Sequence, residues 1–250
     1  MEDYGPSTYG ERWADVYDAW VSRQSHVADS EQIAERLAEI AGAGPALELA
    51  IGTGRVALPL VARGVEVHGI DASQAMVAKL REKPGGDAVP VTIGDFADVP
   101  VDGAYPLAYV VFNTFFALLS QEEQVRCFRN VETHLADGGV FVMEAFVPDP
   151  TYYERGQSVR ATEVEPELAS FTVALHDAVE QRVRAMIVVL EGTRVALLPV
   201  QLRYAWPSEI DLMARLAGLR LRERWGGWDR SPFTSDSGKH VSIYERAPSG

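Results

Sequence analysis

An acidic residue and two closely spaced glycines stand in one short stretch, Ala46-Leu-Glu-Leu-Ala-Ile-Gly-Thr-Gly-Arg55. Its apolar first half predicts a buried strand, Gly52 and Gly54 predict a tight turn, and the residues from Arg55 onward predict a helix. A helix that begins at such a turn presents free backbone N–H groups, and glycines let a ligand approach the backbone closely. The stretch therefore predicts a ligand site at the end of its strand.

A second carboxylate follows about twenty residues later, at the end of the next apolar run. Val65-Glu-Val-His-Gly-Ile70 predicts a second strand, and Asp71 follows it directly. A carboxylate there can accept hydrogen bonds from both ribose hydroxyls of a nucleoside. A dinucleotide fingerprint would need a small residue at position 55, where this chain has Arg55. The alternative, a turn that serves packing alone, does not account for Asp71.

This spacing resembles motif I of the class I S-adenosylmethionine (SAM) dependent methyltransferases, in which an acidic residue comes four residues before the glycine turn. Glu48 and Gly52 have that spacing here, while Ala50 replaces the first glycine of the family's motif. The resemblance implies SAM as cofactor and S-adenosylhomocysteine as its product. The residues that it assigns to this part of the cofactor site are Glu48, Ala50, Gly52, Gly54, Asp71 and Ala72.

The segment Tyr9–Trp20 is rich in aromatic residues, and Trp13, Val16, Tyr17 and Trp20 share one face of a predicted helix. Many small-molecule methyltransferases carry a Tyr-Asp pair in an N-terminal helix that covers the SAM site. The resemblance therefore implies that Tyr17 contacts the methionine part of the cofactor. The alternative is a helix that only packs its aromatic stripe on the core.

A third predicted strand, Val89–Ile93, ends in Gly94-Asp95-Phe96. In the family an acidic residue followed by an aromatic one belongs to the adenine site. The resemblance implies that the Asp95 carboxylate accepts a hydrogen bond from the exocyclic amine, with Phe96 and Met76 on the two sides of the ring. The alternative is that Asp95 caps a turn.

The fourth strand, Leu107–Phe112, is a continuous apolar run and therefore predicts burial on both faces of a parallel sheet. It ends in Asn113, which we assign to the cofactor site. DNA amino-methyltransferases carry Asn-Pro-Pro followed by an aromatic residue at this point. Both prolines are absent here, so base-flipping chemistry is not supported.

The order of elements predicts an α/β fold, namely a doubly wound, mostly parallel seven-stranded sheet of the Rossmann-like methyltransferase type with an antiparallel β insertion. The insertion is predicted because the pattern changes at Val147 to long β-rich runs, with a hairpin signal at Glu191-Gly-Thr193. We expect an N-terminal helical lid over 1–45, a core of 46–147 and 207–250, and the insertion over 148–206. Ser208 and Asp211 are spaced as a cap pair for the last helix. The layout resembles glycine N-methyltransferase and the amino-sugar N,N-dimethyltransferases, where such an insertion roofs the substrate pocket.

The sulfonium of SAM is already activated, so holding the nucleophile in line can supply much of the acceleration and a general base is optional. The candidates for a base are Glu144, His176 and His240, by position or by residue type. For each, a hydrogen-bonded structural role is the alternative. Asn113 and Glu144 are just two oxygen ligands without a His or Cys cluster, so we expect no metal and disfavour a metal-dependent catechol methyltransferase.

The composition limits the partners of the chain. Its 250 residues, 47 % hydrophobic and 24 % charged, are typical of a globular protein, and no apolar run of about 18 residues predicts a membrane span. The N-terminus lacks a signal-peptide core, and the single cysteine, Cys127, suits a reducing cytoplasm. The formal charge of −13 argues against nucleic acid and favours a small-molecule substrate. The oligomeric state stays open, a homodimer included.

The sequence thus predicts SAM-dependent, metal-independent methyl transfer to an oxygen or nitrogen of a small molecule, a specialised metabolite. The motifs report only the nucleoside, and a fold does not fix a function. The alternative is therefore a SAM-binding protein on the same fold that catalyses a cyclisation or acts as a scaffold.

Overall fold

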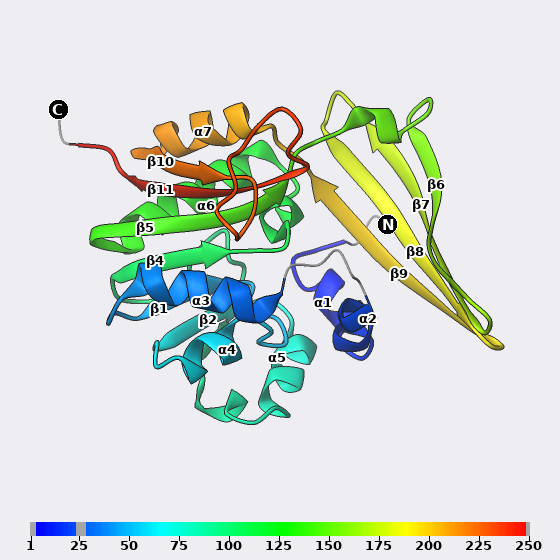
Figure 1. Cartoon of the computed structure of the whole chain (residues 1–250), viewed down its shortest axis with the longest axis horizontal. Coiled ribbons are helices and arrows are strands. Elements are labelled where there is room, and N and C mark those ends of the chain that lie inside the picture. The colour runs from blue at the N-terminus through cyan, green and yellow to red at the C-terminus, as the bar shows by residue number, and fades with distance from the viewer. Residues whose placement is uncertain (1–3, 24–28, 249–250) are drawn as a thin grey trace.

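Five parallel strands form most of a seven-stranded sheet in the computed structural model, which describes residues 4–23 and 29–248 (Figure 1). The strand order is β3-β2-β1-β4-β5-β11-β10, in which β11 runs antiparallel to β5 and β10 antiparallel to β11. The bounds are β1 (Ala46–Leu49), β2 (Val67–Asp71), β3 (Val91–Ile93), β4 (Tyr105–Val110), β5 (Leu135–Phe146), β10 (Leu219–Trp225) and β11 (Lys239–Arg246).

Helices cover both faces of this sheet. One face packs against α3 (Ser30–Ala41) and α4 (Ala57–Ala62), and α5 (Gln74–Arg81) adds Leu80 to the same apolar cluster. The other face packs against α6 (Gln121–His134) and α7 (Pro207–Leu216). All four residues of β1 are buried, as a central strand covered on both sides requires. The predicted doubly wound sheet is confirmed.

The direction of winding reverses beside β1, which pairs with β2 on one side and with β4 on the other. In such sheets ligands bind at the carboxyl ends of the strands, at the point where the order reverses. The glycine turn that follows β1 lies at this point. Short 3-10 helices occur at η1 (Gly86–Ala88), η2 (Thr114–Ala117) and η3 (Pro150–Tyr152).

Four long antiparallel strands form a second sheet, in the order β6-β7-β8-β9. They are β6 (Gln157–Glu165), β7 (Leu168–Asp177), β8 (Arg182–Glu191) and β9 (Arg194–Arg203). Gly192, at φ +56°, lies in the tight turn between β8 and β9, where the sequence predicted a hairpin. The antiparallel insertion is therefore confirmed as a sheet of its own.

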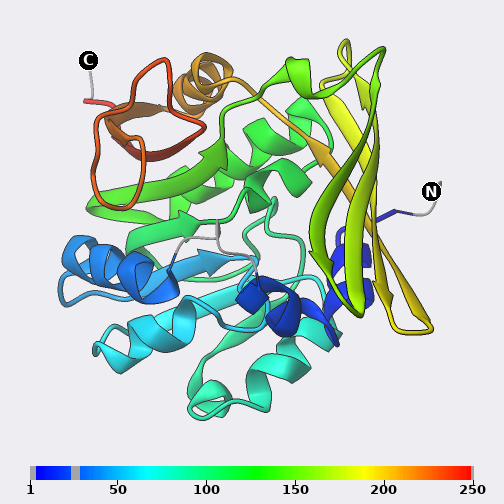
Figure 2. The same cartoon turned by 45° about the vertical axis from the view of Figure 1, so that its right-hand side comes forward.

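The N-terminal segment lies between the two sheets (Figure 2). It forms two short helices, α1 (Thr8–Trp13) and α2 (Tyr17–Arg23), where one continuous helical face was expected. The aromatic residues still gather: the Trp13 and Trp20 rings lie 5.0 Å apart, and Leu198 of β9 packs in the same cluster. The segment thus joins the inserted sheet to the core.

The end of the chain corrects one local expectation. Ser208 does not cap the last helix: Trp206 is its N-cap without a side-chain hydrogen bond, and Pro207 is its first residue. Asp211 pairs with Arg224 at 2.6 Å, because that half-buried guanidinium competes for its carboxylate. Within the described residues, no helix is long and apolar enough to cross a membrane.

Candidate functional site

A cleft opens at the carboxyl ends of β1 and β2, beneath the N-terminal segment. We term it the main cleft, and it holds about 940 Å³ of space, part of it open to solvent. Eight of the eleven residues predicted to bind the cofactor line it, namely Tyr17, Ala50, Gly52, Asp71, Ala72, Met76, Asp95 and Phe96. Three do not: Glu48, Gly54 and Asn113.

The glycine turn and Asp71 form the floor of the main cleft. Gly52 has φ +57°, and a Cβ on it would meet no atom within 4 Å, so the space above the turn is free for a ligand. The Gly52 N–H donates to Asp71 Oδ2 at 2.7 Å, and the Ser73 N–H donates to Asp71 Oδ1 at 2.8 Å. Two backbone donors therefore fix the carboxylate at the end of β2, although burial raises its pKa.

Glu48 and Gly54 pack behind the glycine turn, on the side away from the main cleft. The Tyr109 hydroxyl donates to Glu48 Oε2 at 2.9 Å, and burial raises the pKa of the Glu48 carboxyl to about 8. Gly54 has φ +76°, and a Cβ on it would collide with the Leu80 side chain of α5. Both residues shape the turn, and the structure places neither on the surface of the main cleft.

A second corner of the main cleft lies beyond β3. The buried side chains of Met76 and Phe96 line the main cleft together with Asp95, so the three residues predicted for the adenine border the same space. Asp95 Oδ1 also accepts a hydrogen bond from the Ala97 N–H at 2.9 Å. Its other oxygen, Oδ2, lies 3.8 Å from Arg126 Nη2. Asp95 therefore caps the turn, as one of the two predicted roles required, and stands at the edge of the main cleft.

The N-terminal helices close over the main cleft through specific contacts. Gly10 of α1 packs so tightly on Ser73 that a Cβ would collide with it, and the Ser73 hydroxyl donates to Glu11 at 2.9 Å. The carboxylate of Asp18 on α2 accepts from the Thr53 hydroxyl at 2.6 Å and pairs with Lys83 at 2.6 Å. The helices are therefore bound to the glycine turn and to α5, next to Tyr17.

Arg55, which directly follows the glycine turn, lies beside Tyr17. Its guanidinium carbon is 3.3 Å from the centre of the Phe112 ring, and Nη2 donates to the Tyr17 hydroxyl at 3.4 Å. Arg55 Nε is buried and has no hydrogen-bond partner among the described residues. The sequence analysis used Arg55 only to exclude a dinucleotide site, and missed this cation beside Tyr17 of the main cleft.

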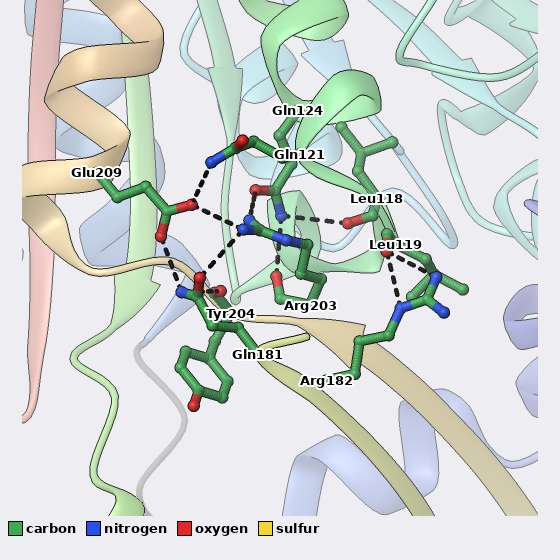
Figure 3. Close-up of polar contacts among 9 residues, drawn as sticks. All are labelled: Leu118, Leu119, Gln121, Gln124, Gln181, Arg182, Arg203, Tyr204 and Glu209. Carbon is green, nitrogen blue, oxygen red and sulfur yellow. Dashed lines mark hydrogen bonds and ion pairs between the residues drawn. The ribbon is translucent and has the colours of Figure 1, made fainter. Parts of the chain in front are cut away.

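A buried polar cluster holds the far wall of the main cleft to the inserted sheet (Figure 3). Arg203 of β9 donates to Gln124 at 2.7 Å and pairs with Glu209 of α7 at 2.7 Å. Gln124 donates to the carbonyl of Leu118, and Arg182 donates to that of Leu119. Since Leu118 and Leu119 line the main cleft, the cluster positions this wall.

A second cavity lies between the end of β5 and the inserted sheet, and His176 borders it together with Phe146, Tyr153 and Tyr204. The His176 ring stacks on Tyr153 with centroids 4.4 Å apart, and its Nε2 shares a hydrogen bond of 2.8 Å with the Tyr204 hydroxyl. His176 is thus the one of the three candidate bases that borders a described cavity.

The other two candidate bases and Asn113 are engaged elsewhere. Glu144 accepts from the Phe112 N–H at 3.1 Å and pairs with Lys239, which leaves its buried carboxylate inside the sheet. His240 is fully buried, bonded through Nδ1 to Ser242, and burial lowers its pKa to about 4. Asn113 accepts from the Phe146 N–H at 2.6 Å and thereby joins the ends of β4 and β5. These positions do not support a catalytic role for Glu144 or His240, or cofactor contact by Asn113.

Further residues of the main cleft were not predicted. They come from the N-terminal segment, from η2 and the turn after it, and from the first turn of α6: Tyr4, Tyr9, Thr114, Ala117, Leu118 and Glu123. The aromatic bias around Tyr9 was the available signal for the first group. No sequence pattern marked the second, because its position depends on the fold of the loop after β4.

The comparisons with known proteins agree with this geometry. A family described as "Methyltransferase domain" matches residues 46–139. The structure of the CcbJ methyltransferase from Streptomyces caelestis is 40 % identical, covers 98 % of this chain and 100 % of its own, and superposes with a TM-score of 0.92. The cypemycin N-terminal methyltransferase of a Streptomyces species is 28 % identical over 96 % of this chain and 98 % of its own length. SAM-bound CalS10, an amino pentose methyltransferase from Micromonospora echinaspora, shares the fold at 21 % identity, 93 % and 97 % coverage and a TM-score of 0.71.

Proposed function

Because this chain belongs to the SAM-dependent methyltransferases, we propose that it transfers the methyl group of SAM to an amine nitrogen of a small specialised metabolite. The observation that carries the proposal is the main cleft, in which a free glycine turn, the fixed Asp71 carboxylate and an apolar corner lie together. SAM is the cofactor, and it supplies an electrophilic methyl group on a sulfonium.

The described residues fit this cofactor. We propose that Asp71 accepts from the ribose hydroxyls, that Met76 and Phe96 enclose the adenine, and that Asp95 accepts from its amine. Tyr17 then lies at the methionine end, beside the Arg55 guanidinium whose Nε lacks a partner. The free space above Gly52 supports the same placement, because only a backbone without a side chain leaves room for the nucleoside there.

An amine acceptor agrees with the charges of the chain and with its relatives. The names of the cypemycin and amino pentose enzymes specify amine-bearing substrates. Asp71 and Asp95 are proposed to bind the cofactor, which leaves Glu123 as an acidic side chain of the main cleft for the acceptor, and the chain has a formal charge of −13. Both favour an acceptor that is cationic in water, and they disfavour a nucleic acid as partner.

Transfer to an amine requires positioning more than proton removal. An acceptor that arrives as an ammonium first loses one proton to water; the neutral amine then offers its lone pair to the sulfonium methyl group, and the methylated product loses its second proton after the transfer. Burial raises the pKa of Tyr9 well above its ordinary value and also that of Tyr17, so both hydroxyls stay protonated near neutrality. We propose that such hydroxyls orient the acceptor, and that alignment at near-attack distance supplies roughly 7–11 kcal/mol of the barrier reduction.

The domain organisation, the independence from metal and the location of the protein form part of the same proposal. We propose residues 1–45 as a lid, 46–147 with 207–250 as the cofactor domain, and 148–206 as a roof for the acceptor. Transfer is proposed to be metal-independent, and the location cytoplasmic, as the single cysteine suggests. No observation favours the alternative of a SAM-binding protein without methyl transfer.

A panel of paired acceptors tests the nitrogen preference. Amines and the matching alcohols are incubated with SAM, with and without a chelator, and methylated products are measured by mass spectrometry. We expect products from amines alone, unchanged by the chelator. Transfer to alcohols alone, or activity that Mg²⁺ must restore, would contradict the proposal.

His176 is tested in the same assay. His176→Asn should keep turnover within about tenfold, since no base is required, whereas loss of a general base costs about 10²–10⁴-fold. A loss of at least about 10²-fold at unaltered SAM affinity would make His176 the base.

A further inference from the structure

Two adjacent residues after β4 have a backbone conformation that is rare for their residue types. Phe112 has φ +57° and Asn113 has φ +65°, so both lie in the left-handed region. Asparagine tolerates this region, but a bulky aromatic residue there is a genuine outlier. Strain of this kind persists only where the surrounding structure fixes it, and it is concentrated at functional sites. These two residues, here termed the strained turn, therefore need partners that hold them in place.

Glu144 of β5 holds the strained turn with both its side chain and its main chain. The Phe112 N–H donates to Glu144 Oε2 at 3.1 Å, and the Asn113 N–H donates to the Glu144 carbonyl at 3.3 Å. The other carboxylate oxygen, Oε1, accepts from Lys239 Nζ at 3.2 Å. Glu144 is only 4 % exposed, so its carboxylate is fixed between these two donors. One buried side chain thus sets the backbone of the strained turn.

The strained turn supports the main cleft at Tyr17. The Phe112 ring covers the Arg55 guanidinium, whose carbon lies 3.3 Å from the ring centre. Arg55 Nη2 in turn donates to the Tyr17 hydroxyl at 3.4 Å. Of these three side chains, that of Tyr17 borders the main cleft. The orientation of Phe112 therefore acts on the main cleft through Arg55.

The strained turn also begins the far wall of the main cleft. Asn113 is the N-cap of η2, and its carbonyl accepts from the Phe116 N–H at 3.0 Å. Thr114 and Ala117 of η2 line the main cleft, as does Leu118 directly after it. A change in the backbone of Asn113 would therefore displace these wall residues.

We propose that Glu144 is a positioning residue for the methyl transfer proposed above, on which this inference rests. By fixing the strained turn, Glu144 holds Tyr17, at the proposed methionine end of the cofactor, in register with the far wall. An amine that lies against this wall then meets the methyl group in line. Glu144 acts through the strained turn and touches neither SAM nor the acceptor. Because a misplacement of about 1 Å can cost about 10²-fold in rate, loss of this support should lower kcat.

Substitutions at Glu144 test the proposal, with kcat expressed per SAM site counted by calorimetry. Glu144→Ala removes the side chain that accepts from the Phe112 N–H, and kcat should fall about 10- to 100-fold. The KM for SAM should stay close to that of wild type, because Asp71 keeps both of its backbone donors. Glu144→Gln offers an amide oxygen in the same place and should restore kcat.

The matched control is Lys239→Met. It breaks the ion pair with Glu144 but leaves the acceptor of the Phe112 N–H in place, so kcat should stay close to that of wild type. A purely structural role of Glu144 would lower the melting temperature and the number of SAM sites, but not kcat per site. Phe112→Leu keeps an apolar side chain and removes the ring that covers Arg55, so it should lower kcat in the same way as Glu144→Ala.

The outcomes separate this inference from the proposed function. Wild-type kcat per site in both Glu144→Ala and Phe112→Leu would overturn the positioning role, and Phe112→Leu decides alone if Glu144→Ala does not fold. An equal loss of kcat in Glu144→Gln or in Lys239→Met would overturn it as well. A wild-type chain that methylates no acceptor would overturn the proposed function, and this inference with it.

Discussion

The carboxylate of Asp71 offers the sharpest test of the cofactor site. In the structure each of its oxygens already accepts one backbone N–H, from Gly52 at 2.7 Å and from Ser73 at 2.8 Å. Its side chain therefore has a fixed orientation, and the remaining lone pairs face the main cleft. Asp71→Asn keeps the shape but removes the charge and turns an N–H₂ group toward one of these donors.

The expected loss follows from the hydrogen bonds involved. A hydrogen bond to a charged group contributes about 1.5–3 kcal/mol, and each 1.4 kcal/mol changes affinity about tenfold. Asp71→Asn should thus weaken SAM binding about 10- to 100-fold, as calorimetry with SAM and S-adenosylhomocysteine can measure. Asp236→Asn, at an exposed loop position, is the matched control and should bind normally. A folded Asp71→Asn protein with wild-type affinity would refute the ribose assignment.

Three further substitutions test the support of the glycine turn, the buried polar cluster around Arg203 and the contact of α1 with Ser73. Burial raises the pKa of Glu48 from 4.5 to about 8, so the folded chain holds a proton that the unfolded chain has released. The free energy of unfolding should then fall as the pH rises from about 5 to 8, by up to about 1.4 kcal/mol per pH unit, and Glu48→Gln should remove this slope in denaturant melts. Arg203→Lys should cost about 1–3 kcal/mol in urea unfolding because it breaks a buried cluster, while the control Arg220→Lys, at an exposed pair, should cost less than about 1 kcal/mol. Gly10→Val should lift α1 off Ser73 and weaken SAM binding while circular dichroism stays unchanged; unchanged binding would mean that α1 does not cover the cofactor.

The sequence was most informative where local pattern and chemistry coincide. Gly52, Asp71, Asp95 and Phe96 all line the main cleft, since the segments that carry them follow directly on strands whose ends are fixed by the parallel sheet. The inserted strands were likewise recognisable from their length and from the hairpin at Gly192.

The predictions that the structure does not support share a physical reason: a partner distant in sequence decides in which direction a polar side chain points. Asp211 has the spacing of a cap residue but pairs with Arg224, and His240 follows a loop yet lies in the sheet interior beside Ser242. Glu144 stands near a strand end, but its partner is Lys239 of the neighbouring strand. Tertiary pairing of this kind leaves no periodic signal in one sequence.

The central claim, methyl transfer from SAM to an amine, is tested most directly with SAM that carries a deuterated methyl group. The chain is incubated with this donor and an amine acceptor, and both products are quantified by mass spectrometry. We predict one labelled methyl group on nitrogen for each S-adenosylhomocysteine formed. Cofactor binding without any labelled product across the acceptor panel, or label on carbon or oxygen alone, would contradict the account.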